Sequence, residues 1–228
     1  MKRNETLKFA LMKTAPIAVS YFFVAMSFGL LMSQNGFPWY DAVLASVFVY
    51  TGAFQFVLAS FLSAGTPLLT IALTALFMNS RQVFYSLSFL DDFRSCGKMF
   101  PYMVGTLTDE TYSLYSSIDR YPDHVDKYAA MKEIAFLSHF WWILGTFAGA
   151  LAGSLLPISI RGIDFTLTAL FLTIVMDQWQ KAKDHIPALT GFACAIGCLV
   201  AFGPSRFILP SLILTSGILL ARNERRHA

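Results

Sequence analysis

Apolar stretches of helix length recur along the whole sequence, and they constrain its fold more than any other feature. A helix needs about 20 predominantly apolar residues to cross the hydrocarbon core of a bilayer. Eight stretches approach or reach this length, at residues 15–34, 41–64, 67–90, 99–117, 133–156, 162–179, 186–204 and 206–221. They predict an all-α fold, a polytopic transmembrane helical bundle of seven or eight segments in a single domain over residues 1–228.

The composition supports a membrane location. Of the 228 residues, 56% are hydrophobic and only 14% are charged, which is too apolar for an ordinary soluble domain of this size. The net charge of +3 comes mostly from Lys and Arg in loops and at the termini, so it carries topology information and does not indicate nucleic-acid binding. Cys194 and Cys198 lie in an apolar segment without a histidine, and we expect neither a metal site nor another cofactor.

The distribution of Lys and Arg predicts the orientation of the chain, because cytoplasmic loops carry the excess of these residues. With the N-terminus in the cytoplasm, the basic loop residues left outside are Arg94, Lys98, Arg161 and Arg206. The excess of Lys and Arg stays on the cytoplasmic side only if the polar segment 99–117 crosses the membrane. Both termini then lie in the cytoplasm. No small-x-small cleavage pattern follows the first apolar segment, so we expect that segment to stay as a helix.

A short internal repeat suggests a transporter architecture. Residues 73–77 and 167–171 both read Leu-Thr-Ala-Leu-Phe, in the third and sixth segments. If segments one to three correspond to four to six, the two copies have opposite orientations, which is typical of secondary transporters. A match this short also arises by chance, so this inverted repeat, followed by a C-terminal hairpin, stays a hypothesis.

Arg81 is the most informative polar residue, because it stands inside the third apolar segment beside Asn79 and Gln82. A charge at bilayer depth costs roughly 2.5 to 3.5 kcal/mol on insertion scales, so it needs a partner or a water-filled path. The planar guanidinium suits a carboxylate, either of a substrate or of an acidic side chain. Snorkelling of Arg81 to the membrane interface is the alternative.

Asp109 and Glu110 supply the counter-charge if the fourth segment crosses. Adjacent helical residues point about 100 degrees apart, so one carboxylate can pair with Arg81 while the other faces a cavity. That second carboxylate would bind a substrate ammonium or carry a proton. The alternative is an extramembrane loop with a helix cap at Thr108.

The second segment contains the string Tyr50 to Phe56, in which Gln55 offers both a donor and an acceptor. Gly52 allows close approach of another helix, or a helix that is broken to line a cavity. The alternative for Gln55 is a hydrogen bond that only holds two helices together.

Other polar residues receive structural interpretations. We expect Asp164 to cap the sixth segment, Asp177 to lie at the interface, and His139 to be a hydrogen-bonded packing residue, with pH sensing as the alternative. Neither a Walker lysine loop nor a Gly-x-Ser-x-Gly elbow occurs, so we do not expect an enzyme.

Residues 50–56, 79–81, 108–110 and 164–171 together resemble the AzlC family of branched-chain amino acid exporters, and the likeness covers roughly residues 10–220. The resemblance implies the large subunit of a two-component exporter in the bacterial cytoplasmic (inner) membrane. Its partner would be a small hydrophobic AzlD-like membrane protein, and its substrate leucine, isoleucine, valine or methionine, with protons as a candidate coupling ion. Thr51, Phe54 and Gln82 depart from the pattern expected for the family, and the missing histidine at Gln82 argues against proton coupling there.

The sequence therefore predicts a secondary exporter of small apolar amino acids. The residues predicted to bind substrate are Tyr50, Gln55, Asn79, Arg81, Asp109 and Glu110. The predicted apolar pocket wall consists of Phe54, Phe56 and Phe77. The rival interpretation is a structural or regulatory membrane subunit without a transport path, in which the charged residues only fix the helix register.

Overall fold

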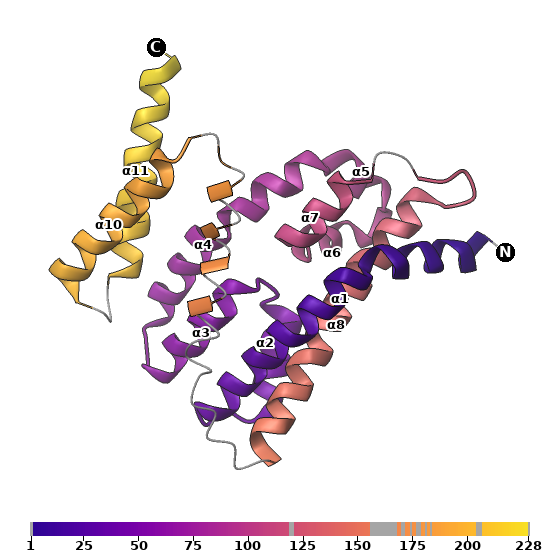
Figure 1. Cartoon of the computed structure of the whole chain (residues 1–228), viewed down its shortest axis with the longest axis horizontal. Coiled ribbons are helices and arrows are strands. Elements are labelled where there is room, and N and C mark those ends of the chain that lie inside the picture. Colours follow the sequence, from indigo (N-terminus) through magenta and orange to yellow (C-terminus); the bar gives the residue numbers. More distant parts are fainter. Residues whose placement is uncertain are drawn as a thin grey trace. The chain divides into compact units, whose positions relative to one another are not determined.

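The computed structural model describes residues 2–118, 121–155, 168–169, 172–173, 175–176, 179–180, 182, 184–203 and 207–227. All regular structure in these ranges is helical (Figure 1), which confirms the predicted all-α class for the described part of the chain. The chain divides into two compact units. The first contains residues 1–63 and 81–166, and the second contains residues 64–80 and 167–228.

The first unit holds most of the helices. They are α1 (Lys2–Gln34), α2 (Trp39–Phe48), α3 (Ala53–Ser63), α5 (Leu90–Ser95), α6 (Phe100–Gly105), α7 (Asp109–Ser116) and α8 (Lys127–Leu155), with a 3-10 turn at Gly97–Met99. Helix α4 (Leu68–Ser88) runs across the boundary between the units at residue 81. The second unit also contains α10 (Ile186–Phe202) and α11 (Ile208–His227).

Two of the predicted apolar segments are interrupted. Residues 41–64 form α2 and α3, separated at residues 49–52, where Gly52 adopts a φ of +60°. Only glycine enters this left-handed region without a steric penalty, and Gly52 directly precedes the first residue of α3, so the helix cannot continue through it. Residues 99–117 form α6 and α7, separated at residues 106–108, because Thr108 takes an extended conformation and caps a new helix. A break at Gly52 was one of the two alternatives that the sequence left for the first of these segments, and a cap at Thr108 belonged to the alternative for the second.

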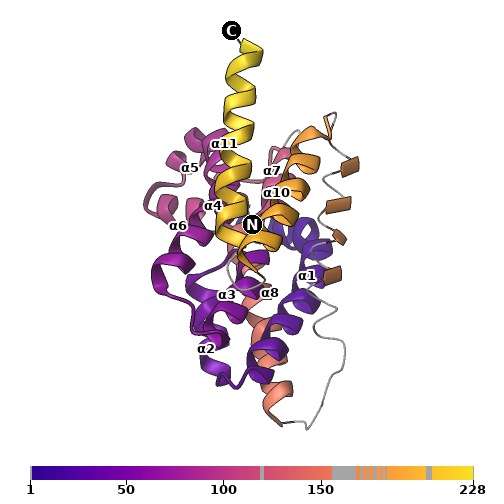
Figure 2. The same ribbon diagram turned by 90° about the vertical axis from the view of Figure 1, so that its left-hand side faces the viewer.

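Helices α1 and α8 pack side by side and run in the same direction (Figures 1 and 2). Three glycines of α8, spaced four residues apart at Gly145, Gly149 and Gly153, lie against Phe22, Met26 and Ser33 of α1, respectively. A β-carbon on Gly149 would stand 2.0 Å from the carbonyl oxygen of Met26. Small residues at this spacing allow two helix backbones to touch, as in membrane helix pairs.

Both members of this pair are long and apolar enough to cross a membrane, over Asn4–Gln34 and Lys127–Leu155. The shorter apolar helices among the described residues are Trp39–Phe48, Ala53–Ser63, Ile186–Phe202 and Ile208–Arg222. Most of the predicted segment 162–179, including one copy of the repeat, lies outside the described residues. The count of eight spans and the inverted repeat therefore stay predictions.

In the second unit, α10 and α11 lie antiparallel. The guanidinium of Arg222 lies 2.8 Å from the carboxylate of Asp184, and Gly191 lies against Thr215. Of the residues between these helices, 204–206 are outside the described part. This arrangement has the geometry that the sequence suggested for a C-terminal hairpin.

Replacing Gly149 by Ala is expected to destabilise the protein by about 1 to 3 kcal/mol, because the new methyl group overpacks a backbone contact. Gly197 of α10 is the matched control, since a β-carbon there meets open space. Gly197→Ala is expected to be neutral or to stabilise by up to about 1 kcal/mol, the intrinsic helix preference of Ala. Unfolding of the purified protein in detergent measures both, and equal effects would contradict the close contact.

Candidate functional site

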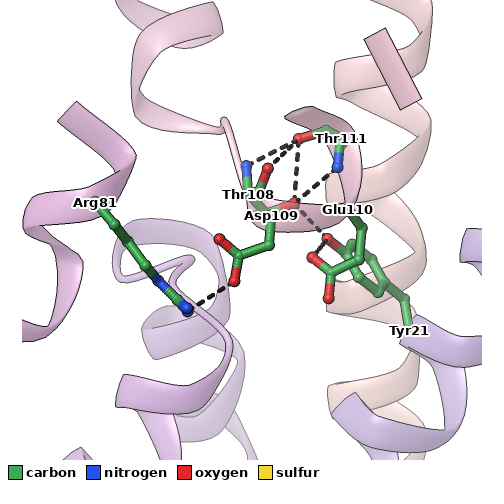
Figure 3. Close-up of polar contacts among 6 residues, drawn as sticks. All are labelled: Tyr21, Arg81, Thr108, Asp109, Glu110 and Thr111. Carbon is green, nitrogen blue, oxygen red and sulfur yellow. Dashed lines mark hydrogen bonds and ion pairs between the residues drawn. The ribbon is translucent and has the colours of Figure 1, made fainter. Parts of the chain in front are cut away.

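The predicted ion pair between Arg81 and an acidic residue is present (Figure 3). Nη2 of Arg81, on α4, lies 2.7 Å from Oδ2 of Asp109, the first residue of α7. The two side chains are 34% and 33% exposed, so the pair is partly buried. Since Arg81 has a fixed partner within the chain, snorkelling is not required to explain its position.

Glu110 points away from this pair, toward α1 (Figure 3). The hydroxyl of Tyr21 donates a hydrogen bond to Oε2 of Glu110 at 2.7 Å, and it also bonds to Oγ1 of Thr108. The adjacent carboxylates of Asp109 and Glu110 therefore serve two different partners, as expected for neighbouring positions on one helix.

The start of α7 is fixed by a reciprocal cap. Oγ1 of Thr108 accepts from the backbone N–H of Thr111, while Oγ1 of Thr111 accepts from the backbone N–H of Thr108. These bonds satisfy donors that the first helical turn leaves open. The cap at Thr108, which the sequence suggested as part of the loop alternative, is thus present, and it presents Asp109 and Glu110 at the first turn.

The interruption between α2 and α3 carries Tyr50, which is only 4% exposed. The centroid of its ring lies 4.5 Å from that of His139 and 6.0 Å from that of Trp142, both on α8. The ring centroid of Tyr21, on α1, lies 6.3 Å away. Within the described structure, the hydroxyl of Tyr50 has no hydrogen-bond partner. An aromatic cluster of α1 and α8 therefore covers this helix break.

Gln55 is fully buried at the start of α3. Its Nε2 donates to Oγ of Ser46 at 3.1 Å, and Ser46 in turn lies 2.7 Å from Oγ1 of Thr146. Because these two hydrogen bonds join α2, α3 and α8, they support the interpretation of Gln55 as an interhelical link. Its Oε1 has no partner among the described residues, so Gln55 also keeps an open acceptor.

His139 is a hydrogen-bonded packing residue, as the sequence suggested. Its Nε2 lies 3.1 Å from the backbone carbonyl of Ser46, and its Nδ1 lies 3.1 Å from the hydroxyl of Tyr102. Since a carbonyl can only accept, Nε2 carries the proton. His139 thereby links α2, just before one helix break, to α6, just before the other.

The remaining predicted site residues are distributed as follows. Phe54 and Phe56 are buried in the first unit, where Phe56 packs edge-on against Phe28. Asn79 and Phe77 are partly buried on α4 and belong to the second unit. Asp164 and Asp177 lie outside the described residues. In the part of the chain that is described, no three or more His, Cys, Asp or Glu side chains are grouped so that they could hold a metal ion.

The sequence analysis did not single out four residues that contact the two helix breaks or the helices beside them. They are Tyr21, Ser46, Trp142 and Thr146. Few features of the sequence could have identified these four residues. Tyr21 is the one hydroxyl-bearing aromatic residue between residues 15 and 34, and Ser46 and Thr146 are small polar residues in otherwise apolar helices.

Comparison with known proteins agrees with the resemblance seen in the motifs. Residues 16–156 match the model of the family described as AzlC protein. The branched-chain amino acid transport protein AzlC of Bacillus subtilis is 34% identical over 207 residues, covering 90% of this chain and 81% of that protein. An uncharacterized membrane protein of Helicobacter pylori (strain J99) is 35% identical over 210 residues, or 92% of each chain.

The inner membrane protein YgaZ of Escherichia coli is 32% identical over 211 residues, covering 87% of this chain and 81% of that protein. No solved structure matches the chain. Together these relatives support a membrane location and a role in transport rather than in catalysis.

Thr108→Val is expected to destabilise the protein by about 0.5 to 2 kcal/mol, because it removes the cap of α7 while keeping the side-chain shape. Thr190→Val is the matched control, since within the described residues the hydroxyl of Thr190 bonds only to Ile186 of its own helix. Detergent unfolding of both variants measures the difference. If Thr108→Val is no less stable than Thr190→Val, the cap does not contribute to stability.

Proposed function

The chain belongs to the AzlC family, and we propose that it is a secondary exporter of branched-chain and similar apolar amino acids. It would act as the large subunit of a two-component system in the bacterial inner membrane, together with a small hydrophobic AzlD-like subunit. Leucine, isoleucine, valine and methionine are the proposed substrates, and the proton gradient or the substrate's own gradient would drive export. The proposal extends the membrane location that the names of the relatives give and the transport role that the name of the Bacillus subtilis relative gives.

The observation that carries the proposal is the charge arrangement at the start of α7. Arg81 and Asp109 form a 2.7 Å ion pair. Glu110 carries a second negative charge, and its carboxylate accepts a hydrogen bond from Tyr21 instead of pairing with Arg81. An amino acid zwitterion requires one cationic and one anionic contact, and the first turn of α7 brings both close together. Such charges inside a membrane are costly and are typical of transport pathways.

The parallel packing of α1 and α8 supports placing this turn inside the bilayer. If both helices span, the chain between them must return to the side on which α1 begins, which requires an odd number of crossings. Predicted segments 41–64, 67–90 and 99–117 supply three crossings only if the last of them crosses. This agrees with the Lys and Arg bias, which puts both termini in the cytoplasm.

Each part of the substrate has a proposed contact. Arg81 and Asn79 would bind the carboxylate, and Asp109 or Glu110 would bind the ammonium or a proton. A guanidinium has five N–H donors, and Nε of Arg81 has no partner in the described part of the chain, so the pair with Asp109 leaves donors for a carboxylate.

The remaining contacts concern the path and the substrate side chain. Tyr50 and Gln55 would line the path, with the open Oε1 of Gln55 as an acceptor. The pocket-wall residues Phe54, Phe56 and Phe77 would bury the apolar side chain of the substrate.

A structural or regulatory subunit remains the second candidate, and one observation favours it. The ion pair of Arg81 and Asp109 is satisfied within the chain, and buried polar pairs can serve to fix helix register. In that case the pair would matter for assembly, and the chain would move no amino acid.

An efflux assay separates these two functions. Cells that carry the full chain with its small partner, loaded with leucine through a leucine-containing dipeptide, are expected to release leucine faster than cells that carry the partner alone. The same holds for isoleucine, valine and methionine. Equal release in both strains for all four amino acids would refute the exporter proposal.

Arg81→Ala is expected to reduce leucine efflux to background while the protein still inserts into the membrane. Arg81→Lys keeps the charge and the pairing partner but loses the planar fork, so it should retain only part of the efflux. Arg94→Ala is the matched control, because the side chain of Arg94 is 66% exposed and its ion pair with Asp91 is long, at 3.8 Å. Full efflux in Arg81→Ala would remove Arg81 from the site.

Asp109→Asn tests whether Asp109 carries protons. If it does, the residual leucine efflux of this variant changes its dependence on pH, since an amide does not titrate. A role limited to pairing with Arg81 lowers the rate without moving the pH profile. Asp91→Asn, at a side chain that is 99% exposed, is the control and should match the unmodified protein in both readouts.

A further inference from the structure

The charges around the first turn of α7 do not cancel. Arg81 contributes one positive charge, while Asp109 and Glu110 contribute two negative charges. Because Arg81 lies 2.7 Å from Asp109, the pair is neutral as a unit. Glu110 is bonded to a neutral hydroxyl and remains exposed, so the local excess of negative charge resides there. A site with this balance attracts a cation.

The hydrogen bonds that hold Glu110 have a defined direction. Tyr21 donates its only proton to Oε2 of Glu110, so Tyr21 must accept from the hydroxyl of Thr108. That hydroxyl in turn accepts from the backbone N–H of Thr111. The hydrogen bonds therefore follow one another from the backbone of Thr111 to the hydroxyl of Thr108, then to the hydroxyl of Tyr21 and finally to the carboxylate of Glu110. Successive hydrogen bonds of this kind strengthen one another.

Tyr21 cannot easily move away from this position. It is 2% exposed, and its ring packs edge-on against Trp142 at 5.2 Å and against Tyr50 at 6.3 Å. Tyr21 therefore fixes Glu110 on the side facing α1, apart from Arg81 (Figure 3). The buried hydroxyl of Tyr50, which makes no hydrogen bond in the described structure, is a second polar atom in this cluster.

We propose that Glu110 is the acceptor of the substrate's α-ammonium group and that Tyr21 is the residue that positions it. This proposal rests on the proposed export of amino acids and decides between the two carboxylates that the export model left open. A primary ammonium has three N–H donors, and Glu110 offers it the carboxylate oxygen that Tyr21 does not bond. The hydroxyl of Tyr50 is the second acceptor. Asp109 is left to hold Arg81.

The test compares leucine with 2-hydroxy-4-methylpentanoate, which has the same side chain and carboxylate but a hydroxyl in place of the ammonium. Inside-out membrane vesicles from cells that carry the full chain and its small partner take up labelled leucine in the direction of export. Half-saturation by leucine and inhibition by the hydroxy acid are measured separately. A residue that contacts the ammonium, or that positions such a residue, changes the first without the second.

Glu110→Gln is expected to raise the half-saturation concentration for leucine about tenfold or more, the loss typical of a hydrogen bond to a charged group. Inhibition by the hydroxy acid should not change. Tyr21→Phe keeps the ring and removes the hydroxyl, so it should raise the same constant by a smaller factor, again without changing inhibition by the hydroxy acid. Its maximal rate should be retained.

Glu5→Gln and Tyr40→Phe are the matched controls, because both residues are exposed and lie far along α1 and α2 from the cap of α7. Three results would overturn the assignment: equal weakening of leucine and hydroxy acid in Glu110→Gln, a changed pH profile with unchanged half-saturation for leucine, or selective loss of leucine in Asp109→Asn alone. If the unmodified protein takes up no leucine, the export function itself fails.

Discussion

The close parallel contact between α1 and α8 determines where the polar residues of the first unit lie. Glycines at every fourth position let the two backbones touch, so neither helix can rotate freely about its axis. The contact therefore fixes the position and direction of polar and aromatic side chains on both helices, namely Tyr21 on α1 and His139, Trp142 and Thr146 on α8. Each of these four side chains reaches one of the two interrupted helices or the residues beside them.

Interrupted helices need such support, because a bilayer does not satisfy backbone groups that lack hydrogen bonds. The break at residues 49–52 is covered by the aromatic cluster around Tyr50, and the break at residues 106–108 is closed by the cap at Thr108. His139 bonds to residues just before both breaks. The two irregular regions are thus tied to one rigid helix pair, which explains how polar residues can be held there without a regular helix around them.

The sequence predicts the charged part of the site well and its framework less well. A charge in an apolar segment needs a partner or a path to water, so the sequence offered Asp109 and Glu110 as acidic partners of Arg81, and the structure shows the pair with Asp109. The helix breaks were only alternatives in the sequence, because hydropathy does not report backbone dihedral angles and a glycine such as Gly52 suits close packing as well as a break. Tyr21 escaped notice because a tyrosine in a membrane segment usually marks an interface, and its bond to Glu110 joins residues 89 positions apart. The roles of Asn79 and Phe77 stay predictions.

The lengths of α2 and α3 have a consequence for how a substrate would pass. At 10 and 11 residues, these helices are about 15 and 16 Å long, so each covers roughly half of a hydrocarbon core that is about 30 Å thick. In the proposed transporter, the break at Tyr50 to Gly52 then lies near the middle of the bilayer, with one half-helix toward each surface. The polar groups at the break, Tyr50 and Gln55, would then be about equally far from the two membrane surfaces, at the depth where a substrate in transit is furthest from water on both sides.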